Sequence, residues 1–390
     1  MVFRSFGAAA LVLVASILTG CQYTGIEPPA SSASASPAPA APIDQQARFF
    51  LAQGAVSAVV RVDWPGGEWS KAYGVRDLGT KDPAQPGDRV EVGTATETFT
   101  AVTVLKLVED HLIGLDDPVN NVIPGFAELH PPAAITVREL LAQASGIPDY
   151  VPTALPGVDP RPALAQPLSL EQALADAAGR PWPLSSVGVF QFTTTNYAAL
   201  GLLVQTLRHK PFSEVLDQEI IAPLGLKHTS LAHLDLAQKD ILHGYITLHG
   251  QQIDLTDNTR FAGSSSAGLV TTMGDMDTFL AALFGGRLLS ASSLAAMETS
   301  PGFSAYDLGV WKGPNGCNGA AQRFHAASIA ENAVTAAITS ADGKYTASMT
   351  VVPPPLPGAL EDPSGDRQRQ ELGLQVEYAL HDALETLCPK

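Results

Sequence analysis

The chain has 390 residues, of which 45% are apolar and 16% are charged. Such a chain can bury a hydrophobic core larger than one small fold needs, so a mainly disordered protein and a miniature disulfide-stapled fold are both excluded. Asp and Glu outnumber Lys and Arg by 39 to 23, for a net charge of −16. This acidic balance disfavours nucleic acid as a partner, because phosphate binding needs a basic surface.

Residues 1–20 predict an export signal. Arg4 precedes an apolar run over residues 7–18, and small residues follow. The run is shorter than the roughly 20 residues that a membrane-spanning helix needs. The motif LTGC at 18–21 resembles the bacterial lipobox, which implies cleavage before Cys21 and lipidation of Cys21. The resemblance implies an exported protein, lipid-anchored to the outer face of the bacterial cell membrane. The alternative is an ordinary signal peptide with a chance cysteine.

Residues 21–45 predict a lipidated cysteine followed by a linker rich in Pro, Ala and Ser, and residues 46–390 predict the folded domain. A flexible linker of this length averages roughly 25 to 30 Å from end to end. Export places the fold in an oxidising compartment, where Cys317 and Cys388 are able to form a disulfide. Two buried free thiols are the alternative.

Strand patterns lie near both ends of the domain and helical patterns lie between them. The expected hairpins join residues 55–62 to 68–75 and residues 332–339 to 345–352. Helical spacing of apolar residues predicts a helix over 368–387.

A further helix is expected over residues 99–112, apolar on nearly every side except for a strip of Lys106, Glu109 and Asp110. We therefore expect it to be central and enclosed. The expected fold class is α+β: a three-layer α/β/α domain with an antiparallel sheet (about 46–95 and 260–390) and an inserted all-helical domain (about 96–259).

Four segments of this chain resemble a known superfamily. They are FTAVTVLKLVEDHLIGLDDPVNNVIPGF (99–126), ITVRELLAQASGIPDY (135–150), NYAALGLLVQTLRHKPFSEVLDQEIIAPLGL (196–226) and AGLVTTMGDMDTFLAALFGGRLL (267–289). They are similar to the serine β-lactamases and D-alanyl-D-alanine carboxypeptidases, in the class C β-lactamase-like and penicillin-binding-protein-like branch. The resemblance implies a β-lactamase/transpeptidase-like fold and no cofactor. The two late cysteines also look like the pattern of the actinomycete carboxypeptidases.

That superfamily uses S-x-x-K, Y-x-N and K/H-x-G elements, and this chain departs from the first at Thr94-Ala95-Thr96-Glu97. Threonine can be a nucleophile when a base activates it, but Glu97 stands where the lysine would be. A carboxyl group with a reference pKa of about 4.3 is a weak base at neutral pH. The pattern T-x-x-E also predicts a capping box, in which Thr94 binds the third helical amide and Glu97 reaches back.

The other two elements are altered as well. Phe192-Thr193-Thr194 aligns with Y-x-N, so the relaying hydroxyl and the carboxamide are both lost at Phe192 and Thr194. Tyr197 would restore a tyrosine in a shifted register, but it belongs to the following helix and is expected to pack inward.

The third element becomes His325-Ala326-Ala327. His325 matches the histidine variant of this position and can donate to a carboxylate or help a proton transfer. Ala327 replaces the glycine and adds a methyl group where a substrate backbone would lie. By resemblance, the oxyanion hole uses backbone near Thr94, Ala327 and Ser328.

Three other patterns carry no site. Thr103 and Lys106 fit T-x-x-K but lie within the enclosed helix, and the serines of segment 263–268 lack the glycine spacing of a nucleophile elbow. The nine histidines show no metal-binding spacing. We expect no metal.

The altered elements predict a catalytically impaired cell-envelope lipoprotein that binds a ligand or regulates a partner. The expected partners are the membrane, through lipid on Cys21, and a peptidoglycan peptide, a β-lactam-like ligand or another envelope protein. The alternative is an active hydrolase of the carboxypeptidase, β-lactamase or esterase type that uses Thr94 as its nucleophile.

Overall fold

The computed structural model describes residues 40–155, 157–182, 187–234, 236–299, 305–317, 320–330, 333–358 and 361–388, and for 314–316 and 320–330 it describes the backbone. The helices are α1 (Ala41–Ala52), α2 (Thr96–Glu109), α3 (Val137–Leu141), α4 (Val151–Ala154), α5 (Arg161–Leu164), α6 (Leu170–Ala178), α7 (Thr194–Arg208), α8 (Phe212–Leu216), α9 (Ala222–Leu224), α10 (Met273–Phe284), α11 (Ala291–Met297) and α12 (Pro363–Leu387), with shorter turns η2 (Gly93–Ala95), η3 (Phe126–Leu129) and η4 (Asp217–Ile221). The strands are β1 (Ser57–Trp64), β2 (Gly67–Gly74), β3 (Val90–Glu91), β4 (Tyr245–Leu248), β5 (Gln251–Asp254), β6 (Val270–Thr271), β7 (Trp311–Gly316), β8 (Ala320–Ala330), β9 (Ala333–Thr339), β10 (Thr346–Val352) and β11 (Leu356–Pro357).

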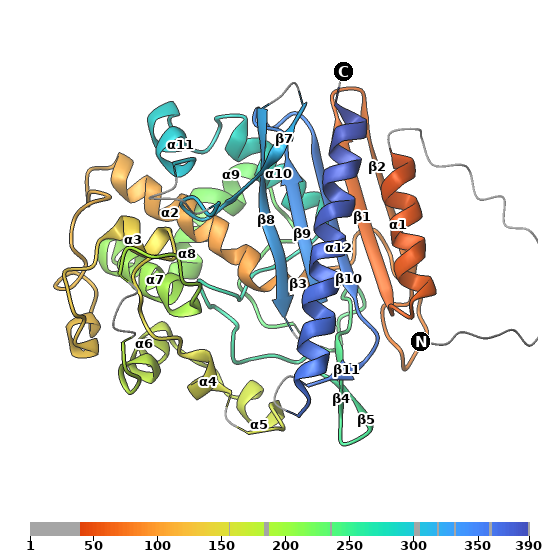
Figure 1. Cartoon of the computed structure of the whole chain (residues 1–390), viewed down its shortest axis with the longest axis horizontal. Coiled ribbons are helices and arrows are strands. Elements are labelled where there is room, and N and C mark those ends of the chain that lie inside the picture. Colours follow the sequence, from red (N-terminus) through yellow and green to blue (C-terminus); the bar gives the residue numbers. More distant parts are fainter. Residues whose placement is uncertain are drawn as a thin grey trace, which may run out of the picture. The chain divides into compact units, whose positions relative to one another are not determined.

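The main sheet has six antiparallel strands in the order β2-β1-β10-β9-β8-β7 (Figure 1). Both predicted hairpins are confirmed, as β1 with β2 and β9 with β10. β1 pairs with β10, with Val60 opposite Met349, so the two ends of the domain share one sheet. The chain between β2 and β7 is therefore inserted between halves of the same sheet.

Side chains that alternate along the strands pack on opposite faces of the sheet. Val60, Ile338 and Met349 belong to a core that α1 and α12 cover (Figure 1). Val59 and Ala337 belong to the other core, which includes the buried residues of α10 and α2. The expected three-layer α+β architecture is confirmed.

Two boundaries, and the content of one segment, differ from those expected. α1 begins at Ala41, inside the expected linker, because Ile43, Ala47 and Phe50 recur at helical spacing and are buried against the sheet. α12 begins at Pro363, with Asp362 as its N-cap residue. The segment expected to be all helical also carries the β4–β5 hairpin, which pairs with β11 in a three-stranded sheet.

α2 is the central helix that the sequence predicted. Eleven of its residues are buried, and Lys106 and Glu109 form its half-exposed side. Among the described helices, none combines the length and the apolar character needed to cross a membrane.

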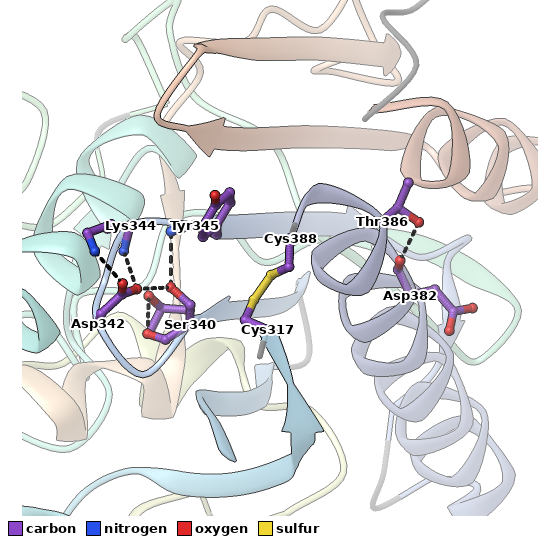
Figure 2. Close-up of a disulfide and its surroundings, with 9 residues drawn as sticks. Cys317, Ser340, Asp342, Lys344, Tyr345, Asp382, Thr386 and Cys388 are labelled. Atoms are coloured by element: carbon purple, nitrogen blue, oxygen red, sulfur yellow. Dashed lines mark hydrogen bonds and ion pairs between the residues drawn. A yellow bond between two sulfur atoms is a disulfide. The ribbon is translucent and has the colours of Figure 1, made fainter. Parts of the chain in front are cut away.

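A disulfide joins Cys317, after β7, to Cys388, at the end of α12 (Figure 2). The bond connects an edge strand of the main sheet to the helix that covers one face of it, across 71 residues of sequence. The predicted pairing is present, and the alternative of two free thiols is not.

Candidate functional site

Thr94 lies half-buried in the turn η2 that leads into α2. Gly93 enters this turn with φ +49°, a left-handed conformation that glycine adopts without steric cost. The predicted capping box is wrong: the N-cap residue of α2 is Ala95, and no side chain caps it. Because the chain makes a 3₁₀ turn through Thr94, the helix begins two residues later, and Glu97 points into the protein instead of back toward the cap.

Glu97 is fully buried and binds two polar side chains. The side-chain amide of Gln143 donates to the carboxyl group, with Nε2 3.3 Å from Oε1 and 3.2 Å from Oε2. The hydroxyl of Tyr306 lies 3.1 Å from Oε2. Among the hydrogen bonds of the described residues, none joins Thr94 to Glu97.

Burial raises the pKa of Glu97 well above its usual range, and the negative charge of Asp149 raises it further. The hydrogen bonds from Gln143 and Tyr306 lower this pKa, but they do not outweigh the loss of water around the charged form. Burial therefore favours the neutral, protonated form of Glu97 in the folded protein.

The hydroxyls around Glu97 are compatible with a protonated Glu97. Tyr306 Oη lies 3.2 Å from Tyr197 Oη, and Tyr197 donates to the backbone carbonyl of Leu141 at 2.8 Å. Each hydroxyl has one proton. If Glu97 were ionised, Tyr306 would donate to it and the tyrosine–tyrosine contact would hold no proton. When Glu97 donates its own proton to Tyr306, Tyr306 is able to donate to Tyr197, and Tyr197 donates to the carbonyl of Leu141. Each of these three hydrogen bonds then has one proton.

Gln143 connects this acid to the second altered element. Its side-chain carbonyl accepts from the backbone amide of Thr193 at 3.0 Å and from Asn196 Nδ2 at 2.5 Å. Gln143 is fully buried, and its φ is +54°, which is uncommon for a residue other than glycine. Backbone strain of this kind persists only where the surroundings hold it, and it clusters at functional sites.

Phe192 and Thr194 are not part of the buried acid's surroundings. The Phe192 side chain is 44% exposed, and Thr194 Oγ1 donates to Asp149 at 2.5 Å. Tyr197 is fully buried in α7, as the sequence predicted, so it does not replace the missing tyrosine.

Three aromatic rings meet at Tyr306. The ring centroid of Phe190 lies 5.7 Å from that of Tyr306 and 5.5 Å from that of Trp311, and the Tyr306 and Trp311 centroids are 4.9 Å apart. Tyr306 itself has no exposed surface. The hydroxyl that contacts Glu97 therefore belongs to a packed aromatic cluster and not to an open cleft.

The third element lies on β8, which contacts η2 and so approaches Thr94. The pairing of β8 with β9 is regular up to His325 and resumes at Ser328, so the irregularity falls at Ala326 and Ala327. Irregular pairing of this kind is common next to active sites, where it redirects the backbone. The side chain of His325 lies outside the described part of the structure. Strand β8, which carries Ala327 and Ser328, thus contacts the turn that carries Thr94, and the predicted oxyanion hole stays a prediction.

Thr103, in the T-x-x-K pattern, has a structural role. Thr103 is buried, and its hydroxyl donates to the carbonyl of Thr100 at 2.7 Å. The described residues include no group of three or more His, Cys, Asp or Glu side chains able to hold a metal ion. Gln143 and Tyr306 are the site residues that sequence reasoning missed. The segment AQASGIPDY, which resembles the superfamily, was the sequence signal near Gln143. No sequence pattern indicates a glutamine in the left-handed conformation.

Comparisons with known proteins identify the family and the fold of this chain. A model of the Beta-lactamase family matches residues 43–326. Protein flp of Staphylococcus aureus (strain MW2) is 27% identical over 180 residues, which cover 45% of this chain and 34% of that protein. The match therefore spans about a third of the length of this curated relative.

Two solved structures have a similar fold. A D-stereospecific amidohydrolase from Streptomyces sp. superimposes with a TM-score of 0.70 and 24% identity, over 80% of this chain and 94% of that chain. A D-amino acid amidase from Ochrobactrum anthropi SV3, complexed with D-phenylalanine, gives a TM-score of 0.72 and 21% identity, over 88% and 98% of the two chains. At these identities the likeness shows the fold alone.

Proposed function

Because the chain belongs to the Beta-lactamase family, with a serine β-lactamase and penicillin-binding-protein-like fold, we propose that it is a catalytically impaired cell-envelope lipoprotein. In this proposal the site around Thr94 binds a ligand, or regulates a partner, without hydrolysing it.

One observation carries the proposal. At the position where the resembling superfamily has a lysine, Glu97 is fully buried, is hydrogen-bonded to Gln143 and Tyr306, and has a raised pKa that favours its neutral form. A neutral carboxylic acid has no basic lone pair of the kind that removes a proton from a hydroxyl, so it cannot activate Thr94 as a nucleophile. Phe192 adds no hydroxyl in place of the tyrosine. Neither Glu97 nor Phe192 can therefore act as a general base for Thr94.

The ligand that we propose is a peptidoglycan peptide or a β-lactam-like compound, with another envelope protein as the alternative partner. The proposal draws on the two fold relatives, described as a D-stereospecific amidohydrolase and a D-amino acid amidase. It draws also on the contact between the turn η2, which carries Thr94, and strand β8. Carbonyl binding by backbone amides needs no lysine.

We propose further that Cys21 carries lipid and holds the protein at the outer face of the cell membrane. The lipobox-like motif at 18–21 and the preceding apolar run support this location. The Cys317–Cys388 disulfide fits an oxidising compartment outside the cytosol.

A turnover assay tests the proposal. Purified protein is incubated with nitrocefin, a D-alanyl-D-alanine peptide and a short ester, beside a Thr94→Ala variant. The proposal predicts the same background rate for both proteins, together with stabilisation of the folded state by the peptide or the β-lactam in a thermal-unfolding experiment. Turnover that is lost in Thr94→Ala would establish the alternative, a hydrolase that uses Thr94.

A further inference from the structure

A cavity of about 550 Å³ lies at the far ends of the two helices that carry the candidate site. α2 and α7 begin at the site, with Thr96 and Thr194, and their last turns reach the cavity, which Lys106 and Arg208 line. Ten helical residues, or about 15 Å along the axis, separate Thr96 from Lys106. The cavity is therefore distinct from the site around Thr94.

The acidic side chains of this cavity already have partners. Arg208 pairs with Asp110 at 2.7 Å and with Glu219 at 2.8 Å, so one guanidinium holds two carboxylates. Glu109 accepts a hydrogen bond from the backbone amide of Ser290 at 2.6 Å. Each of these carboxylates therefore has a cationic or amide partner, although Glu219 Oε2 has no hydrogen-bond partner among the described residues.

Two cations of the same cavity are without such partners. Lys106 and Arg287 both line it, and within the part of the chain that the structure describes neither makes an ion pair or a side-chain hydrogen bond. Arg287 is exposed and Lys106 is half-buried, so the donors of both side chains are accessible to a ligand. The charges of Glu109 and Glu219 also attract Lys106. The dipole of α2 favours a cation in its last turn, but that interaction uses none of the three hydrogen-bond donors of Lys106.

We propose that this cavity binds a small organic carboxylate with an apolar body. Lys106 and Arg287 bind the carboxylate, and the guanidinium of Arg287 offers the paired donors that suit its two oxygens. Pro223, Leu224 and Leu288 provide apolar surface for the rest of the molecule. The volume lies within the range of small-molecule sites, about 300 to 1,000 Å³. The proposal does not depend on whether the site around Thr94 is catalytic.

Isothermal titration calorimetry of the purified protein with sodium hexanoate tests this proposal. We expect saturable binding that Lys106→Gln combined with Arg287→Gln weakens by about tenfold or more, because both cations that contact the carboxylate are removed. Lys81→Gln combined with Lys227→Gln is the matched control. It removes the same charge from exposed positions outside the cavity and should change the dissociation constant by less than about twofold.

Two further titrants separate the contributions of charge and apolar surface. Inorganic phosphate carries charge without an apolar body and should bind more weakly than hexanoate, while hexylamine carries the opposite charge and should not bind. Three outcomes would overturn the proposal: no saturable hexanoate binding, equal binding by the Lys106/Arg287 variant, or phosphate or hexylamine binding as tight as that of hexanoate.

Discussion

Gln143 binds both carboxyl oxygens of Glu97 through one amide group, at 3.3 and 3.2 Å, while its own backbone holds a left-handed φ of +54°. The same side chain accepts from Thr193 and Asn196 at the start of α7. A strained glutamine therefore fixes the buried acid of α2 to the helix that carries the second altered motif. The hydrogen bonds fix the position of Glu97, while burial raises its pKa and favours its neutral form.

The pH dependence of stability should report the protonation of Glu97. Its pKa is raised above the usual value of 4.5 in the folded protein, so the folded chain keeps a proton that the unfolded chain releases above about pH 4.5. Stability contributed by this proton is fully present below that pH and is lost as pH rises toward the folded-state pKa, by up to about 1.4 kcal/mol per pH unit. Glu97→Gln removes this loss, so its stability relative to wild type should increase with pH.

Urea unfolding at several pH values between about 5 and 8 measures this difference. Glu128→Gln, at an exposed carboxyl in η3, is the control. Its stability relative to wild type should not increase with pH as that of Glu97→Gln does. A constant difference between Glu97→Gln and wild type across the range would contradict a neutral Glu97.

Tyr306→Phe should destabilise the protein by about 1 to 3 kcal/mol, because it leaves Glu97 and Tyr197 without one buried hydrogen-bond partner. Tyr378→Phe removes the same hydroxyl from a side chain that is 67% exposed and should change stability by less than about 0.5 kcal/mol. Equal effects of the two substitutions on the urea midpoint would show that the Tyr306 hydroxyl contributes little.

Gly309 allows a loop to approach α2 closely. Its φ is +90°, and an added Cβ would lie 2.4 Å from Ala101 Cβ and 3.0 Å from the Tyr197 hydroxyl. We expect Gly309→Ala to cost about 3 kcal/mol, from left-handed backbone strain and overpacking together. Gly250→Ala has a similar φ of +75° with nothing within 4 Å, so it should cost only the backbone strain, about 1 to 2 kcal/mol. Equal losses of stability for Gly309→Ala and Gly250→Ala in thermal unfolding would contradict the close approach of Gly309 to α2.

The Cys317–Cys388 disulfide should contribute about 4 kcal/mol of stability in the chain-entropy model, because it closes a long loop. Cys317→Ser, Cys388→Ser and the double variant remove the same bond and should lose the same free energy of unfolding. Single variants as stable as the oxidised wild type would show that the bond adds nothing.

The sequence predicted the fold because local patterns and architecture agree. The β-branched and apolar residues of 55–62 and 345–352 mark strands that do pair, and the apolar surface of 99–112 marks a helix that is enclosed. The linker boundary was misplaced because Pro and Ala near residue 41 hide the start of α1, whose burial depends on a sheet formed far along the chain.

The site was harder to predict because its contacts are distant in sequence. T-x-x-E at Thr94 matches a local cap, yet Glu97 contacts Gln143 and Tyr306, 46 and 209 residues away. A carboxyl group at a helix N-terminus is expected to have a lowered pKa, but burial raises the pKa of Glu97. The sequence identified the positions that depart from the motifs of the superfamily. Only the three-dimensional contacts showed that Glu97 is a buried acid bound by Gln143 and Tyr306.

Intact-mass spectrometry tests the central proposal most directly. The full chain, Thr94→Ser and Thr94→Ala are each treated with a fluorophosphonate and with penicillin, and the protein mass is measured. Because neutral, buried Glu97 cannot activate a hydroxyl at position 94, we predict no covalent adduct on the wild type or on Thr94→Ser. An adduct on the wild type that is absent from Thr94→Ala would contradict the proposal and establish Thr94 as a working nucleophile.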